Sequence, residues 1–530
     1  MRTVETIRSK KQPVKETGVS DPLKLTVFEK AVLLLSSFAV MLFVTCSSPL
    51  YAFNYWDDAN CYMTLGRGIL HGLAPYRDLY EQKGPLLYIV HAVTALISQD
   101  SFFGVWLLEI GMAVVFSFFV WKTVKLCTSP LKHAVLIMPA VIAFIYTIGM
   151  MDFGDSSEEL CFPLLTVIVY LVLRDSKKEE DRLPSVKSAF IIGILTAALF
   201  WVKYTFLGPV IGICILMIIW TVKPRAWKKL FADIGMFLAG FAVLTLPIII
   251  YLAASGALGD MYTAYFYNNI FFYSDKDLYE LPILYVPIIG KIVMVLLNTY
   301  GTCLLFPKYA VFILLCITGL ICTGKAYRSR AVQIFTVTLV IALATLLSKQ
   351  QVMPYYAYIT AYLAPFMAIA ISFVVSWISK RFSADGQRLT IIVAAVSVAA
   401  CAFNIITCKN LFMMQYKKSD YPQYRFAEII KETPDANILT YDVMDAGFYM
   451  AAGTLPKTQY FCYLNIEESW PVILEEQDRL IEEKAFDYII AYDNTYEWEG
   501  YEIVDETNFT YTAISGKKVI THFCLYKKTV

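Results

Sequence analysis

Charged residues are scarce in this sequence. Asp, Glu, Lys and Arg make up 17% of its 530 residues, whereas 58% are hydrophobic and the mean hydropathy is +0.56. A soluble globular protein of this length does not need so much apolar surface, so the composition predicts a polytopic membrane protein. The net charge is only +1, which argues against nucleic acid as the main partner.

Several signatures of catalysis and metal binding are absent as well. Only four histidines occur, and no HExxH motif is present, which argues against a zinc hydrolase. The twelve cysteines lack zinc-ligand spacing and most lie in apolar segments, where packing accounts for them; Cys462 and Cys524 share a soluble region and are the one plausible pair. Neither GxGxxG nor a P-loop occurs, so no nucleotide-binding fold is indicated.

About eleven apolar stretches are interpreted as membrane spans. They cover residues 27–47, 103–124, 133–151, 157–174, 187–202, 205–222, 231–254, 307–323, 331–347, 356–378 and 390–407. Basic clusters fall in alternate connections, and acidic or mixed loops lie between them. The positive-inside rule therefore predicts a cytoplasmic N-terminus and an extracytoplasmic C-terminus. Two further apolar stretches, 86–98 and 281–298, are expected to lie along the outer surface, and the second is alternatively re-entrant.

The composition changes abruptly after the last span. Short β-like runs begin at Asn437, Phe486 and Thr521, and residues 467–484 read as a helix. These elements predict a small extracytoplasmic α/β domain. The chain is thus divided into a cytoplasmic segment (1–26), a multi-span domain (27–407) with an outer catalytic loop (48–101), and an outer domain (408–530).

Polar residues concentrate in the first outer loop, between Tyr51 and His91. Two adjacent acids open it, and Lys83 lies near its end; a second acidic cluster, 152–159, precedes the fourth span. Adjacent acids in an exposed loop are most often simply solvated. Several carboxylates on one face of a membrane, however, repel each other unless a cation or a hydroxylated substrate joins them. The pattern therefore suggests proton transfer beside a phosphate-bearing, lipid-linked substrate.

This order of residues resembles the first outer loop of the GT-C superfamily of membrane glycosyltransferases, in particular bacterial members related to protein O-mannosyltransferases and the aminoarabinose transferase. The loop reads Asp57-Asp58, then Gly68-x-x-x-Gly72-x-x-Pro75-Tyr76-x-Asp78, then Lys83-Gly84-Pro85-Leu86. The resemblance continues in Ser157-Glu158-Glu159, Lys203 and Met353-Pro-Tyr-Tyr356, and so spans roughly residues 27–407. One departure is that Gln82 separates Glu81 from Lys83, which leaves the role of Glu81 open.

The resemblance implies a polytopic GT-C enzyme with an outward-facing active site. Its donor would be a polyprenyl-phosphate sugar and its acceptor an envelope glycopolymer (teichoic-acid-like, for example), a glycolipid or a protein. Asp57 would be the general base, and Asp58 would orient the acceptor. Substrate contacts are assigned to Lys83 and Lys203, which neutralise the leaving phosphate, and to Arg77, Asp78, Glu158, Glu159, Tyr355 and Tyr356. The resemblance implies no definite cofactor; a divalent ion held by Asp58 and Glu158 is a further hypothesis.

Two other classes of function compete with this interpretation. A transporter or flippase of lipid-linked glycans usually places ionisable residues near the middle of the membrane and shows inverted repeats. Here the acids lie in outer loops and no repeat is visible, which favours the enzyme. An envelope polysaccharide polymerase or ligase also uses outer loops, but these tend to be rich in arginine, and arginine is sparse here.

Overall fold

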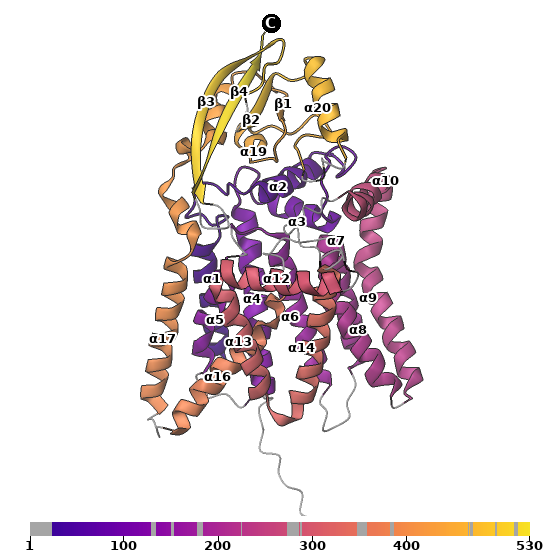
Figure 1. The fold of residues 1–530 in the computed structure, drawn as a ribbon, viewed down its shortest axis with the longest axis vertical. Helices are drawn as coiled ribbons and strands as arrows, with labels where there is room; N and C mark the ends of the chain where they lie inside the picture. The colour runs from indigo at the N-terminus through magenta and orange to yellow at the C-terminus, as the bar shows by residue number, and fades with distance from the viewer. Residues whose placement is uncertain are drawn as a thin grey trace, which may run out of the picture.

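The chain forms a helical bundle with a small sheet-containing domain at one end (Figure 1). The computed structural model describes residues 24–128, 134–149, 153–176, 184–223, 225–272, 283, 286, 289–346, 358–381, 386–464, 466, 470–492, 495–512 and 518–529. Helices α2 (Asp57–Leu70) and α3 (Pro85–Ala95) lie between the bundle and the sheet domain (Figure 1).

Twelve helices of the described residues build the bundle. They are α1 (Val27–Val44), α4 (Phe103–Cys127), α5 (Met138–Tyr146), α6 (Ser157–Asp175), α7 (Val186–Lys203), α8 (Leu207–Val222), α9 (Trp227–Ala254), α12 (Ile289–Leu305), α13 (Pro307–Cys322), α14 (Lys325–Leu346), α16 (Ala364–Arg381) and α17 (Gly386–Ile406). Shorter segments are η1 (Ala134–Ile137), η3 (Tyr204–Phe206), α10 (Leu258–Met261), η4 (Tyr262–Asn268), α11 (Asn269–Phe271) and η6 (Ala361–Leu363). The outward faces carry exposed Leu34, Leu238 and Ile392, as contact with lipid requires. This confirms the predicted helical membrane protein.

The number of long apolar helices is smaller than the predicted number of spans. Seven stretches in the described ranges are long and apolar enough to cross a membrane, or eight if the bent pair α12 and α13 makes one span. The other predicted spans fall on the short helix α5 and on α6, which begins with two glutamates and ends with Arg174 and Asp175. Helix α12 meets α13 at 114° and runs across the bundle (Figure 1), so it does not continue the direction of α13.

Helices α7 and α8 form one apolar stretch of 37 residues, but they run in opposite directions. Near the start of α9, Lys229 donates a hydrogen bond to the carbonyl of Pro184, just before α7. Near the other end, Trp201 of α7 donates to Thr245 of α9, so α7 and α9 are parallel. Helix α8, which connects the two in the chain, must therefore run antiparallel to both. The chain reverses at Lys203, whose backbone is extended (φ −158°, ψ 99°). The reversal places Lys203 at the end of the bundle nearest the sheet domain.

The C-terminal domain, which we call the outer domain after its predicted position, is a four-stranded mixed sheet with helices on both faces (Figure 1). Its strands, in the spatial order β1-β2-β4-β3, are β1 (Ile438–Thr440), β2 (Tyr488–Tyr492), β4 (Lys518–Lys528) and β3 (Tyr501–Thr512). Strands β1 and β2 are parallel, and the other pairs are antiparallel. Side chains of β4 alternate: Cys524 packs with the α20 side (Val472–Glu482), while Phe523 packs with α19 (Phe448–Ala452). The predicted β-like runs coincide with β1, β2 and β4.

The outer domain rests directly on the first outer loop, which contains α2 (Asp57–Leu70) and α3 (Pro85–Ala95). The chain leads from α17 into this domain through two short 3₁₀ helices, η7 (Lys409–Gln415) and η8 (Lys418–Asp420), and then α18 (Pro422–Ile430). Gln459 donates to the carbonyl of Tyr76, and its own carbonyl accepts from the amide of Tyr80. Cys462 lies 3.9 Å from Cys61 of α2, sulfur to sulfur, rather than beside Cys524 as the sequence suggested. The loop is therefore enclosed between bundle and sheet.

Candidate active site

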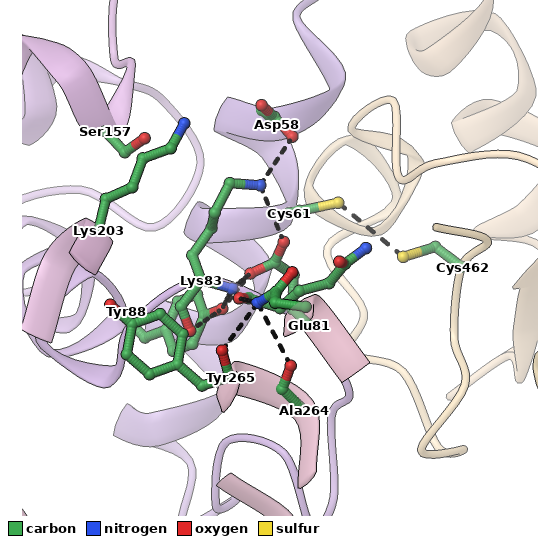
Figure 2. Close-up of polar contacts among 12 residues, drawn as sticks. Asp58, Cys61, Glu81, Lys83, Tyr88, Ser157, Lys203, Ala264, Tyr265 and Cys462 are labelled. Carbon is green, nitrogen blue, oxygen red and sulfur yellow. Dashed lines mark hydrogen bonds and ion pairs between the residues drawn. The ribbon is translucent and has the colours of Figure 1, made fainter. Parts of the chain in front are cut away.

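Lys83 is held in place by side chains of its own loop. Its backbone amide donates to Glu81 at 2.7 Å, and its ammonium group lies 3.4 Å from the other carboxylate oxygen of Glu81. The carbonyl of Lys83 accepts a hydrogen bond from the Tyr76 hydroxyl at 2.7 Å, and the Tyr88 hydroxyl donates to Glu81. Glu81 is completely buried. Its position two residues before Lys83 thus fixes the lysine, a role that the sequence alone left open (Figure 2).

Gly84 joins this loop to the end of α7. Its amide donates to the carbonyl of Val202 at 3.1 Å. A Cβ atom at this position would lie 2.0 Å from the carbonyl oxygen of Trp201, so the close approach requires glycine. This contact brings Lys83 next to Lys203, the last residue of α7, although 120 positions separate them in the sequence.

Five charged side chains meet at this point, and we refer to Asp58, Glu81, Glu158, Lys83 and Lys203 as the charged cluster. Lys203 lies 2.5 Å from Glu158, and Lys83 lies 3.7 Å from Asp58. Burial raises the pKa of Asp58; the charge of Lys83 opposes this rise, and the charge of Glu81 adds to it. Figure 2 shows the two lysines approaching the region of Asp58 from different elements. The cluster combines three carboxylates with two ammonium groups.

Asp57 faces a different environment from Asp58. Consecutive residues of a helix point about 100° apart, and Asp57 turns toward the outer domain, where it lies within the electrostatic reach of Asp445 and Tyr492. Burial raises the pKa of Asp57 to about 8, with further contributions from Asp58 and Asp445. Within the described part of the chain, no hydrogen bond or ion pair holds its carboxylate. Its side chain is half-buried, and its carboxylate has a raised affinity for protons.

The outer domain contributes Asp445 to this site. One oxygen of Asp445 accepts a hydrogen bond from Thr64 of α2 at 2.5 Å, and the other accepts from the amide of Gly447 at 2.8 Å. Burial raises the pKa of Asp445 to about 6. Sequence reasoning missed this residue because nothing in its local pattern indicates a contact with a loop almost 400 positions earlier.

A second buried pair connects α3 to the turn before α6. The Nε2 atom of His91 lies 3.0 Å from both oxygens of Asp155, and Nδ1 lies 2.8 Å from the carbonyl of Leu87. Both partners are acceptors, so the imidazole is a donor at both nitrogens. Burial alone would lower the pKa of His91, but the charge of Asp155 and the hydrogen bonds raise it overall. The pair anchors the surface helix and positions the N-terminus of α6, which bears Glu158.

The remaining predicted site residues have other surroundings. Glu159 exchanges capping hydrogen bonds with Ser156 and lines a small pocket with Glu109, so it points away from Lys203. Arg77 and Asp78 form a bidentate pair, and Arg77 also donates to the carbonyl of Ser255 at the end of α9. The bond from Arg77 to Ser255 thus connects the first outer loop to α9. Contact of Arg77 and Asp78 with the substrate remains a prediction. Tyr355 and Tyr356 lie outside the described residues.

The donor set does not fit the hypothesised divalent ion. Asp58 and Glu158 each face an ammonium group, Lys83 and Lys203 respectively, so a cation would have to displace a lysine from each carboxylate. Among the residues that the structure describes, the set of three close metal-type ligands lies elsewhere, on the β3–β4 hairpin: Glu506, His522 and Cys524.

Comparison with known proteins identifies the fold. No protein-family model matches the sequence, and no curated protein matches it. ArnT from Cupriavidus metallidurans in the apo state aligns with 94% of this chain and 97% of its own at 10% identity, with a TM-score of 0.56. The same protein bound to undecaprenyl phosphate aligns with 94% of this chain and 98% of its own at 11% identity, with a TM-score of 0.53. Arabinofuranosyltransferase AftD from Mycobacteria, by cryo-EM, covers 96% of this chain and 40% of its own at 13% identity, with a TM-score of 0.49. The similarity to ArnT extends over bundle and outer domain and confirms the resemblance in fold to GT-C membrane glycosyltransferases.

Proposed function

We propose that this protein is a membrane glycosyltransferase that moves a sugar from a polyprenyl-phosphate donor to a hydroxyl group on the outer face of the cell membrane. The observation that carries the proposal is the meeting of two lysines from separate elements, Lys83 and Lys203, at Asp58. Asp57, the preceding residue of the helix, faces the other way, and its carboxylate has no hydrogen-bond or ion-pair partner in the described part of the chain. The fold supports it, since ArnT has been solved with undecaprenyl phosphate bound.

The two lysines suit a leaving phosphate. In the reaction, the acceptor oxygen bonds to the anomeric carbon while the bond from that carbon to the phosphate oxygen breaks, and the electron pair of this bond leaves with the phosphate. The phosphodiester thereby becomes a monoester and gains negative charge. Lys83 and Lys203 stabilise this developing charge more strongly than they stabilise the donor, which is the condition for catalysis.

Asp57 suits the general base. The acceptor hydroxyl must lose its proton as its oxygen bonds to carbon, and a carboxylate with a raised pKa takes up that proton more readily than an ordinary one. Asp57 is turned from the charged cluster toward the outer domain, so the attacking hydroxyl and the leaving phosphate lie on opposite sides of the sugar. This arrangement fits inversion at the anomeric carbon. Asp58 faces Lys83 at 3.7 Å, on the side of the leaving phosphate, so we propose that it positions this lysine rather than the acceptor, to which the sequence had assigned it.

The proposal includes the orientation of the chain in the membrane. Basic residues gather at the ends of bundle helices that lie away from the outer domain, for example Lys229 at the start of α9 and Arg381 at the end of α16. The positive-inside rule makes that end cytoplasmic. The active site and the outer domain then face outward, where an envelope glycopolymer, a glycolipid or a protein supplies the hydroxyl.

Transfer of labelled sugar tests this proposal. Membranes carrying the wild-type protein, Asp57→Asn or the control Asp505→Asn receive a panel of polyprenyl-phosphate sugars and cell-envelope acceptors. Asp505 pairs with Arg425 on the outer domain, so its variant should keep full activity. We expect Asp57→Asn to lose a factor of about 100 or more in rate.

Two other outcomes contradict parts of the proposal. Equal transfer by the wild type and Asp57→Asn would remove Asp57 from the mechanism. No transfer from any donor, accompanied by movement of labelled lipid across the bilayer, would establish a flippase instead.

A further inference from the structure

A cavity of about 690 Å³ lies between the C-terminal end of α2 and the outer domain. On the α2 side it is lined by Arg67, His71 and Asp100, and on the side of the outer domain by Lys431, Asp435 and Lys457. The polypeptide from Gly453 to Pro456 forms part of its wall. The same helix that begins with Asp57 therefore ends at this cavity.

Arg67 is the buried cation of this cavity. Its side chain is 5% exposed, and its Nη2 atom donates to the carbonyl of Thr454 at 3.1 Å. Its Nε and Nη1 atoms have no hydrogen-bond partner among the described residues. Burying guanidinium donors without partners is unfavourable. The planar arrangement of these donors matches the oxygens of a phosphate or a carboxylate.

The other charges of the cavity leave it positive. Lys457 is already paired with Asp435 at 2.7 Å, so these two cancel. Lys431 is exposed, and within the described ranges no carboxylate forms an ion pair with it. Arg67 and Lys431 are opposed by Asp100, whose carboxylate accepts a hydrogen bond from Ser98. Asp445 does not line the cavity, but its charge acts on Arg67 more strongly than that of Asp100, so the unused donors of Arg67 and the exposed Lys431 are what the cavity offers an anion. An anionic group would gain both cations and the two unused donors of Arg67.

We propose that this cavity binds an anionic group, a phosphate or a carboxylate, on the acceptor, and that the acceptor is an anionic chain longer than one sugar. The proposal rests on the proposed glycosyltransferase function. Arg67 lies ten positions after Asp57 in α2, which corresponds to about 15 Å along the helix. A hydroxyl at Asp57 and an anionic group at Arg67 must therefore belong to different units of an extended acceptor. Binding energy gained at the cavity would hold the reacting hydroxyl in place.

Direct binding to the purified full-length protein in detergent tests the cavity without using the reaction. The probes are a glycerol-phosphate oligomer, an oligogalacturonate and the neutral maltotetraose, measured by titration calorimetry. We expect one or both anionic probes to bind and the neutral probe not to bind. Arg67→Gln should weaken binding about tenfold or more, since a charge-assisted hydrogen bond is lost.

Two further variants separate recognition from folding. Lys431→Glu changes an exposed side chain at the rim of the cavity, so it leaves the fold intact and should also weaken binding of the anionic probe. Arg479→Gln, an exposed arginine of α20 paired with Glu476, is the control and should bind as the wild type does. Equal binding of all three probes, binding of none, or binding unaffected by both cavity variants would overturn the proposal.

Failure of the cavity and failure of the proposed function give different results. Asp57→Asn should bind the anionic probe normally while losing transfer. If the wild type binds the probe through Arg67 but transfers no sugar, the glycosyltransferase function is wrong and the cavity stands. If sugar transfer is observed and the KM for the acceptor is the same in Lys431→Glu as in the wild type, the cavity does not recognise the acceptor.

Discussion

The pH dependence of transfer offers the sharpest test of Asp57 as the base. Its pKa is raised to about 8 by burial and by the negative charges of Asp58 and Asp445. A general base acts in its ionised form, so kcat/KM should be constant above pH 8 and should fall about tenfold for each pH unit below it. At pH 6 roughly 1% of the plateau value is expected, because about that fraction of Asp57 is ionised.

Asp445→Asn is the perturbation that ties this profile to Asp57. Removing a neighbouring negative charge stabilises ionised Asp57 and lowers its pKa. The acid limb should therefore move to lower pH, and kcat/KM at pH 6.5 should rise. Because the pKa of Asp445 is itself about 6, its charge is present over most of the range in which Asp57 titrates. The amide oxygen of asparagine can still accept the hydrogen bond from Gly447, so the local structure should persist.

The assay is the initial rate of sugar transfer by purified enzyme between pH 5 and pH 9.5. Asp442→Asn is the matched control, since Asp442 lies in the same domain and is bound to Tyr496. Its acid limb should coincide with that of the wild type. A flat profile across this range would refute the reasoning, as would a limb that Asp445→Asn leaves in place.

Three other substitutions probe the parts of the site. Lys203→Met removes one of the two charges on the leaving phosphate and should lower kcat about 100-fold or more in single-turnover transfer, with acceptor binding unchanged. Gly84→Ala brings a methyl group within 2.0 Å of a carbonyl oxygen of α7 and should lower both activity and Tm, whereas Gly111→Ala, which meets nothing within 4 Å, should lower neither. His91→Phe leaves Asp155 buried without its partner and should cost about 3–5 kcal/mol in unfolding free energy, measured by denaturation in detergent; adding Asp155→Asn should recover part of the loss.

The sequence indicated the charged cluster through residue types and topology. Asp58 and Lys83 lie in the first outer loop and Lys203 lies at the outer end of a predicted span, so all three are expected at the same membrane face. The structure brings these three side chains together with Glu158. It separates Glu159 from them, since neighbouring residues at a helix N-terminus point in different directions.

The sequence could not indicate the contacts made by the outer domain. Asp445 and Thr454 follow short loops with no motif, and their partners Thr64 and Arg67 look like ordinary residues of a polar helix. These contacts depend on how two separately folded parts of the chain pack together. The surroundings of a predicted span cannot be inferred from its sequence either. Helix α6 is buried along nearly its whole length, so it packs against protein rather than lipid, and hydropathy does not measure that.

The charge balance of the cluster determines what happens when the donor binds. Three carboxylates and two ammonium groups leave one negative charge in excess, and a donor phosphate adds another. Burial already raises the pKa of Asp58, and its contact with Lys83, at 3.7 Å, is the longest ion pair of the cluster. Asp58 should therefore give up Lys83 to the phosphate and take up a proton from solvent.

Donor binding should accordingly consume protons at neutral pH. Titration calorimetry with a polyprenyl-phosphate sugar, carried out in buffers of different ionisation enthalpy, measures this uptake directly. The wild type should take up a fraction of a proton per donor, and Asp58→Asn should take up less, because its amide has no charge to lose. Uptake that is the same in both proteins would mean that Asp58 keeps its charge. The phosphate would then be bound beside three ionised carboxylates, an arrangement that like-charge repulsion disfavours.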